Sequence, residues 1–355
     1  MNNLLNATDE STALEHLHAL GCTDGLPVVV PTPERVERMV LATGLDGDLN
    51  LGEMGPAWGA ATVHKIAVAA VMAGCLPDHV PVVIAGIMAI CQPEFDLAEM
   101  QGTTHCTAPL MIVNGPARTG CGGIASGFGA LGPGHRANAS IGRALRLAMI
   151  NIGGARPGES DMALHGHPGK FTYCLAEDEE SSPFPPLHTA WGYAPEESVV
   201  TVVGAEAPHS VLFSGDADDP ESASRLLRAL ATAIASPVAN NSFLGGKAAV
   251  TVVLNPDHAT VLARSGYDRP AVQARLAELA VTPREEMNAL NPRMLKTDET
   301  LVPAVRDPKN ILLLVAGGSG LYSMVMPSWG AGPHNNAAVH APIDINPFCE
   351  VPGAI

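Results

Sequence analysis

Charged side chains are scarce in this chain. Asp, Glu, Lys and Arg make up only 16% of 355 residues, and aromatic residues only 4%. Apolar residues reach 46%, which is ample for a core and argues against disorder along the whole chain. Such sparse charge also leaves surface for partner subunits to cover, so we expect a homo-oligomer. The net charge is −16 and no basic stripe interrupts it, which argues against nucleic-acid binding.

Long apolar runs and paired cysteines are also missing. The apolar stretches 66–75 and 80–91 are broken by Pro77 and Asp78 and are too short to span a bilayer. The first residues lack a basic segment followed by an apolar run, so we expect no secretory signal. The seven cysteines include no C-x-x-C pair, which favours reduced thiols over a disulfide framework or a zinc cluster. A cytoplasmic protein that does not enter membranes is therefore expected.

Glycine and proline are abundant, at 36 and 30 residues, and imply many shaped turns. Between these turns, helix and strand patterns alternate. Buried strands are expected from β-branched or apolar runs at 25–32, 110–115, 198–206, 248–255 and 311–320. Helices are expected at 8–20, 33–44, 60–75, 78–91, 136–152 and 220–236, with two or three more within 256–291.

This alternation predicts an α/β fold with a mixed sheet and flanking helices. The weakest boundary lies near residues 181–197, so two sub-domains are expected. The first, 1–190, holds a glycine-rich loop and a polar loop, and the second, 191–355, holds a helical insertion. Residues after 320 are expected to form an extended tail across a neighbouring subunit.

Residues 157–193 concentrate the polar groups that the rest of the chain lacks. Prolines and glycines keep this segment in a loop, and loops on a rigid scaffold often carry function. Lys170, Glu177 and Glu180 are its candidate catalytic groups, because an amine or a carboxylate can act as an acid, a base or a substrate ligand. The alternative is a solvated acidic turn, which is the usual place for a charge run.

The same segment offers candidate metal ligands. His165 and His167 are two residues apart, so in an extended backbone both point to one side. With Glu179 they would suit a divalent ion, which would also relieve repulsion between the neighbouring acids. No H-E-x-x-H motif accompanies them, so a divalent metal is compatible with the sequence but not required by it.

A second group surrounds His105 in QGTTHCTAP, just before an expected strand. Histidine can act as an acid, a base or a metal ligand near neutral pH, although a hydrogen-bonded histidine in a packed turn is the alternative. Cys106 beside it and Cys121 in the glycine-rich loop are the two candidate reactive thiols. A nucleophilic cysteine needs a nearby base or helix end, and adjacency in the sequence does not supply that.

Two glycine-rich turns are candidate anion sites. Residues 127–132 match G-x-G-x-x-G, but a dinucleotide site also needs a helix directly after the motif and an acid at a second strand. Here Pro133 and Gly134 come before the expected helix, and Glu159 and Asp161 lie in a loop. Backbone amides could instead hold a carboxylate or phosphate, with close backbone packing as the alternative. The expected substrate-binding groups are Arg136, Asn138, Gly317, Gly318 and Ser319.

Several stretches taken together resemble an uncharacterised family of bacterial cytoplasmic proteins. They are DGLPVVVPT (24–32), VMAGCLPDHVPVVIAG (71–86), TTH (103–105), IGRALRL and NIGGARPG within 141–158, AEDEESSPFPPLH (176–188) and AGGSG (316–320). The similarity spans most of residues 22–330 and implies one integrated unit. No activity is carried over from this resemblance.

These patterns predict an enzyme that acts on a small anionic molecule by acid–base chemistry, of the lyase or hydratase type. His105 would be the acid or base, with Glu177 or Glu180 as its partner, and Lys170 would help to hold the negative charge. This mechanism requires the acidic cluster to meet His105 in one cavity. Three alternatives stay open: a metal-dependent hydrolase, a cysteine-dependent redox or thiol enzyme, and a non-catalytic binding or assembly protein.

Overall fold

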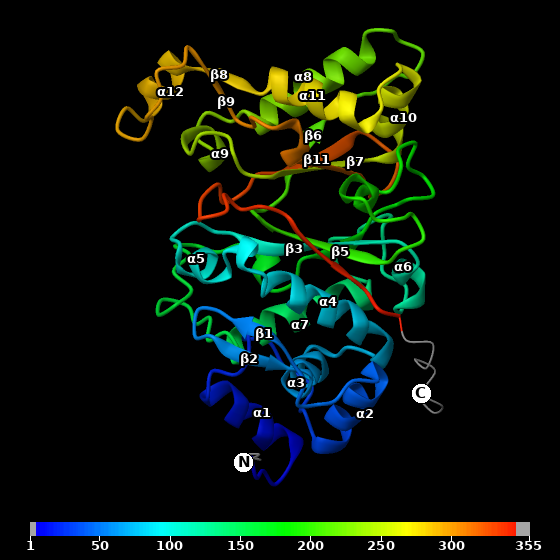
Figure 1. Cartoon of the computed structure of the whole chain (residues 1–355), viewed down its shortest axis with the longest axis vertical. Coiled ribbons are helices and arrows are strands. Elements are labelled where there is room, and N and C mark those ends of the chain that lie inside the picture. Colours follow the sequence, from blue (N-terminus) through cyan, green and yellow to red (C-terminus); the bar gives the residue numbers. More distant parts are fainter. Residues whose placement is uncertain (1–4, 346–355) are drawn as a thin grey trace.

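Two four-stranded sheets stack face to face at the centre of the molecule in the computed structural model, which describes residues 5–345. Helices cover the outer face of each sheet, so the layers run helix, sheet, sheet, helix along the long axis (Figure 1). The expected α/β class with mixed sheets and flanking helices is therefore confirmed.

The first sheet has the strand order β12-β5-β3-β4. Its strands are β3 (Ala108–Asn114), β4 (Cys174–Ala176), β5 (Val199–Ala205) and β12 (Val339–Pro342). β3 runs parallel to β4 and antiparallel to β5. Along β3, Leu110 and Ile112 face the other sheet while Met111 and Val113 face the helices, as the two-residue period of a strand requires. This double burial explains why the strand reads as an unbroken apolar run.

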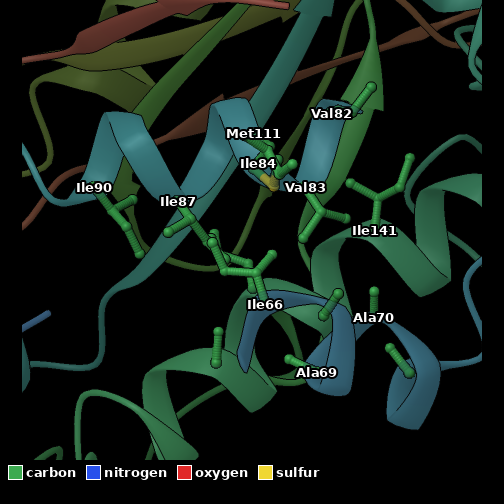
Figure 2. Packing of buried hydrophobic residues seen from close by; sticks show 14 of the residues in the cluster. Ile66, Ala69, Ala70, Val82, Val83, Ile84, Ile87, Ile90, Met111 and Ile141 are labelled. Atoms are coloured by element: carbon green, nitrogen blue, oxygen red, sulfur yellow. The ribbon is translucent and has the colours of Figure 1, made fainter. Parts of the chain in front are cut away.

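Two helices, α4 (Val80–Ile90) and α7 (Arg136–Asn151), cover the outer face of the first sheet, and α3 (Val63–Ala73) packs against them on the side away from the sheet (Figure 1). Alanines on α3, such as Ala69 and Ala70, allow close approach to α4 and α7, while Met111 of β3 reaches into the same cluster (Figure 2). Beyond α3 lie α1 (Glu10–Ala19) and α2 (Pro33–Thr43), and the pair β1 (Asn50–Met54) and β2 (Gly59–Thr62) lies beside α3 (Figure 1).

The second sheet has the order β10-β7-β11-β6. Its strands are β6 (His209–Leu212), β7 (Val250–Leu254), β10 (Ile311–Val315) and β11 (Tyr322–Met326). β10 is parallel to β7, and β11 is antiparallel to both β7 and β6. Its outer face packs on α8 (Ser222–Ile234), α10 (Pro256–Arg264) and α11 (Arg269–Leu279), and its inner face meets the first sheet through residues such as Val253 and Leu314.

The remaining helices, strands and turns are short. They are α5 (Leu97–Gly102), α6 (Ala117–Gly120), α9 (Asn240–Phe243), α12 (Arg284–Leu290), β8 (Val281–Pro283), β9 (Leu301–Pro303) and the 3₁₀ turns η1 (Pro77–His79), η2 (Pro93–Phe95), η3 (Pro168–Lys170), η4 (Leu187–Trp191) and η5 (Pro308–Asn310). Most helices begin and end where the sequence predicts. Thr32 caps α2, for example, and Gly44 ends it in the left-handed conformation.

Two regions differ from expectation. Residues 25–32 form no strand: Pro27 and Pro31 have no N–H to donate, and this segment docks on α3 through Val29, whose N–H bonds the carbonyl of Met72. The segment after residue 320 contributes β11 to the middle of the second sheet and β12 to the edge of the first. Residues 346–355 of the expected tail lie outside the described part of the chain.

Among the helices of residues 5–345, no single one is both long and apolar enough to cross a membrane. The stretches Pro77–Ile90 and Pro93–Gly102 reach the required length and hydropathy only as a pair, with a 77° bend between them.

Candidate functional site

The acidic run 177–180 is built into the contact between the two halves of the molecule. Glu177 follows β4 and is fully buried; its Oε2 accepts from Asn114 Nδ2 and from the Leu187 N–H, both at 2.6 Å. Its Oε1 accepts from Nη2 of Arg269, on α11, at 3.1 Å. Burial raises the pKa of Glu177, and Arg269 opposes that rise. This carboxylate links the first sheet to a helix behind the second.

Glu179 and Glu180 converge on one arginine. Glu179 accepts from the Gly115 N–H at 2.7 Å and lies 3.0 Å from Arg118 Nη2. Glu180 accepts two bonds from the Arg118 guanidinium, each at 2.8 Å, and this pairing lowers the pKa of Glu180 to about 2. Both carboxylates are therefore paired with Arg118, and these ion pairs hold the turn after β4 in place.

His105 does not meet this acidic cluster. It precedes β3, whereas Glu177 bonds Asn114 at the opposite end of the same strand. The six residue steps from Ala108 to Asn114 alone place the two ends of β3 about 20 Å apart. The expected shared cavity is therefore absent, and a proton cannot pass directly between these groups. His105 instead pairs with Glu206, with its Nε2 3.0 Å from Oε1.

A different cavity lies beside the C-terminal half of α7. We call this space of about 780 Å³ the α7 cavity. Its walls are α7, the segment 21–25 after α1, and the loop 155–171. The ionisable side chains that line it are Asp24, Arg146, Arg156, Glu159, Asp161, His165, His167 and Lys170. Three of the sequence-predicted site residues, Lys170, His165 and His167, meet here.

Asp161 organises the inner wall of the α7 cavity. Its side chain is only 4% exposed and accepts from Lys170 Nζ at 2.8 Å and from Arg146 Nη2 at 2.9 Å. Burial alone would raise the pKa of Asp161, but Lys170 and Arg146 outweigh burial and hold it below the ordinary value. Burial also lowers the pKa of Lys170, against the opposing effect of Asp161. A partly desolvated lysine in a cavity is suited to proton transfer.

The two histidines of the loop have different settings. His167 accepts from the Gly169 N–H at its Nδ1, at 3.1 Å, so a neutral ring carries its proton on Nε2. The buried Nε2 faces the backbone of Ala205, and burial lowers the pKa of His167 by more than this contact raises it. His165 is exposed at the cavity mouth. Glu179 lies with Arg118 instead, so the expected ligand set of His165, His167 and Glu179 does not come together.

The described residues hold no group of three His, Cys, Asp or Glu side chains placed to bind a metal ion.

The expected substrate-binding groups lie away from the α7 cavity. Arg136, at the start of α7, donates to the Gly74 carbonyl. Asn138 bonds the backbone of Ala125 through both its side-chain atoms and so fixes the glycine-rich loop. The Gly317 N–H donates to the Ser126 carbonyl, and the Phe128 ring packs where Gly318 would otherwise carry a Cβ. The two glycine-rich turns thus pack on each other, and Ser319 is exposed beside them.

His105 and Glu206 instead open onto a second space of about 820 Å³ along β6, α8 and the segment 236–240. Of the two candidate thiols, Cys121 is buried at 1% exposure and Cys106 is half-buried.

Sequence reasoning missed Arg146, Arg156 and Asp161. A signal for Arg146 was present, since it is a cation on a helix whose neighbouring positions from 144 to 150 are otherwise apolar and almost entirely buried.

Comparisons of the chain with family models, curated proteins and solved structures gave no match.

Proposed function

We propose that the α7 cavity is the active site of a cytoplasmic enzyme that acts on a small anionic substrate by acid–base chemistry of the lyase or hydratase type. The observation that carries this proposal is the sharing of one buried carboxylate, Asp161, by two cations, Lys170 and Arg146. While Lys170 is protonated, one positive charge is left unbalanced on this partly desolvated wall, where an anion would be held.

The other charges of the cavity support an anionic ligand. Asp24 is already paired with Arg143, through bonds of 2.7 and 2.8 Å. Arg156 donates to the Gly21 carbonyl at 3.0 Å and, among the described residues, has no carboxylate within ion-pair distance. Glu159 is exposed at the rim. After internal pairing, the cavity therefore keeps more positive than negative charge.

Each residue has a role in the proposed reaction. Arg146 and Arg156 hold the carboxylate of the substrate. Lys170, in its neutral form, takes a proton from the carbon next to that carboxylate, and Asp161 positions its amine. His165, at the cavity mouth, then gives a proton to the departing hydroxyl group, which leaves as water. Hydration is the same sequence in reverse.

A solvent-exchange experiment tests this proposal. The protein is incubated in D₂O with a panel of small hydroxy acids, enoates and dicarboxylates, and deuterium incorporation or interconversion is followed by proton NMR. We expect at least one panel member to exchange or convert. Lys170→Met and Lys170→Arg should both abolish this, because neither side chain can act as a base near neutral pH. Lys296→Met, at an exposed lysine, is the matched control.

A thiol enzyme centred on Cys106 is the second candidate. Lys170 lies near Cys106, and the neighbouring His105 is paired with Glu206. These are the two kinds of group that activate a cysteine. Iodoacetamide labelling with mass spectrometry separates the candidates: rapid, selective alkylation of Cys106 that also blocks turnover would favour the thiol route.

We also propose that the protein works as a homo-oligomer. Near the mouth of the α7 cavity, Leu164 is 73% exposed and Phe171 is 44% exposed, and apolar side chains in such positions are often covered by another subunit. Light scattering after size exclusion tests this, and Leu164→Asp should shift the protein towards monomer.

A further inference from the structure

A third hollow, with a volume of about 430 Å³, lies between α2, the end of α3 and the start of α7. We call it the arginine cleft. Its lining contains three arginines, Arg35, Arg38 and Arg136, and its other residues are apolar side chains, Gly74 and Cys75. Among the described residues, no Asp or Glu lines this cleft. The chain has a net charge of −16 and only 20 Lys and Arg residues, and three of these residues line this one cleft.

The guanidinium groups are only lightly neutralised. Arg136 contacts the Gly74 carbonyl at 3.0 and 3.3 Å and has no ion pair within residues 5–345. Arg38 lies 3.9 Å from Glu34, and both side chains are at least half exposed. Exposed pairs at that distance contribute little. Arg35 has a closer partner, Glu10, at 2.8 Å. At least two of the three cations therefore remain available to a ligand.

The floor of the cleft is apolar. Met39, Val71 and Pro77 are buried in it, and Val29 stands 41% exposed at its edge. The Cys75 thiol also lines it, and burial raises the pKa of that thiol, so it stays neutral. An occupant would therefore touch hydrocarbon on one side and guanidinium groups on the other.

The arginine cleft is separate from the α7 cavity. Arg136 begins α7 and Arg146 follows ten residues later, which places the two arginines about 15 Å apart along the helix. The two linings share no residue. A ligand in one hollow would leave the other open.

We propose that the arginine cleft is a second ligand site, which binds a small amphipathic anion: a carboxylate or similar acid group on a hydrocarbon or aromatic body. The acid group lies between Arg136 and Arg38, and the apolar body lies on Met39, Val71 and Pro77. The chemistry of the lining selects this class, because an inorganic ion would leave the apolar floor exposed and a neutral apolar molecule would leave the arginines unused.

Titration calorimetry with sodium decanoate, below its micelle concentration, tests the site in the full chain. We expect saturable binding of one decanoate per chain, with decanol and inorganic phosphate binding at least about tenfold more weakly. Arg136→Met should weaken decanoate binding by about tenfold or more, the usual effect of losing a hydrogen bond to a charged group. Arg38→Gln should weaken it in the same direction, and because Arg38 is exposed this variant keeps the test valid if Arg136→Met folds poorly.

Two controls separate this proposal from that for the α7 cavity. Lys170→Met and Lys296→Met should leave decanoate binding unchanged, since neither residue lines the cleft. Loss of binding in Lys170→Met, with normal binding in Arg136→Met and Arg38→Gln, would place the ligand in the α7 cavity and overturn the proposal. No saturable binding, or equal binding of decanol, would overturn it as well.

Discussion

The buried pair Glu177–Arg269 should be the most sensitive charged contact in the molecule. Arg269 is 5% exposed and makes three bonds: to the Leu313 carbonyl at 3.0 Å, to the Pro186 carbonyl at 3.3 Å, and to Glu177 at 3.1 Å. We consider Arg269→Met, which keeps most of the side-chain volume but removes the charge and all the donors. Glu177 would then be an uncompensated carboxylate at 0% exposure.

The magnitude follows from these contacts. Breaking a buried ion pair by removing one partner costs about 3–5 kcal/mol, mainly because the remaining charge is left buried. The whole stability of a domain is about 5–15 kcal/mol, so this one change should remove a large part of it. The penalty should shrink at low pH. The pKa of Glu177 is already raised by burial, and without Arg269 it rises further. The folded state then binds a proton more strongly than the unfolded chain, so stability is regained as the pH falls below the folded pKa.

A double-mutant cycle measured by urea unfolding at pH 8 and pH 5 tests this. In the natural background Glu177→Gln should destabilise, because it leaves Arg269 unpaired. In the Arg269→Met background the same change should stabilise by about 2 kcal/mol, because it removes the stranded charge while keeping an acceptor for Asn114 and Leu187. Additive effects of the two substitutions, or an Arg269→Met penalty equal at both pH values, would refute the reasoning.

Three further outcomes are expected. His79 is 1% exposed, and burial lowers its pKa to about 4. As the pH drops from about 6.5 towards 4, the unfolded chain binds a proton at this histidine before the folded protein does, so the free energy of unfolding should fall. Urea unfolding of His79→Asn should show a weaker dependence on pH. Competitive labelling with acetic anhydride should give Lys170 a titration midpoint below 10.5, because burial lowers its pKa; a midpoint at or above that value would argue against its role as a base. Gly115 and Gly123 both have left-handed φ values, 75° and 71°, but only at Gly115 would a Cβ strike a backbone carbonyl. Gly123→Ala should therefore cost about 1–2 kcal/mol in thermal unfolding, and Gly115→Ala about 1–3 kcal/mol more.

The sequence was most informative where local physics decides the structure. α2 begins after a Thr cap and a proline and ends at a glycine, and each of these signals acts within a few residues. β3, β5 and β7 are apolar runs because both of their faces are buried, one against helices and one against the other sheet. Such a pattern predicts a buried strand, but it does not predict which strands or helices pack against it. The stacking of two sheets was therefore not foreseen.

Short strands were missed for a related reason. β6 is mostly exposed and has only four residues, and β12 gains its place by pairing with β5, 134 or more residues earlier in the chain. Pairing over such a distance depends on the tertiary fold, and no local pattern records it. For the same reason the expected strand at 25–32 was wrong: its apolar residues pack, but no neighbouring strand pairs with them.

The candidate site also depends on contacts between residues that are far apart in the sequence. The run Glu177–Glu180 drew attention as a group of neighbouring carboxylates in a polar loop, with a solvated acidic turn as the alternative. What the sequence could not reveal was the distant cations: Arg118 lies about 60 residues before the run and Arg269 about 90 after it. An acidic run between apolar segments therefore indicates either an active site or a brace. The choice depends on whether cations already satisfy the carboxylates.

The same criterion supports the α7 cavity. At Glu177 one carboxylate meets one arginine, and the charges cancel without a ligand. At Asp161 one carboxylate meets two cations, and the excess charge faces an open space of about 780 Å³. Asp161→Asn should therefore have opposite effects on two measurements. It should destabilise the fold by about 3 kcal/mol, because Lys170 and Arg146 lose their shared partner. It should also raise the affinity of the cavity for anions, because the excess positive charge grows. Tighter binding of a carboxylate probe in a less stable protein would separate a binding cavity from a structural brace, and equal losses of both would show that Asp161 only holds the fold together.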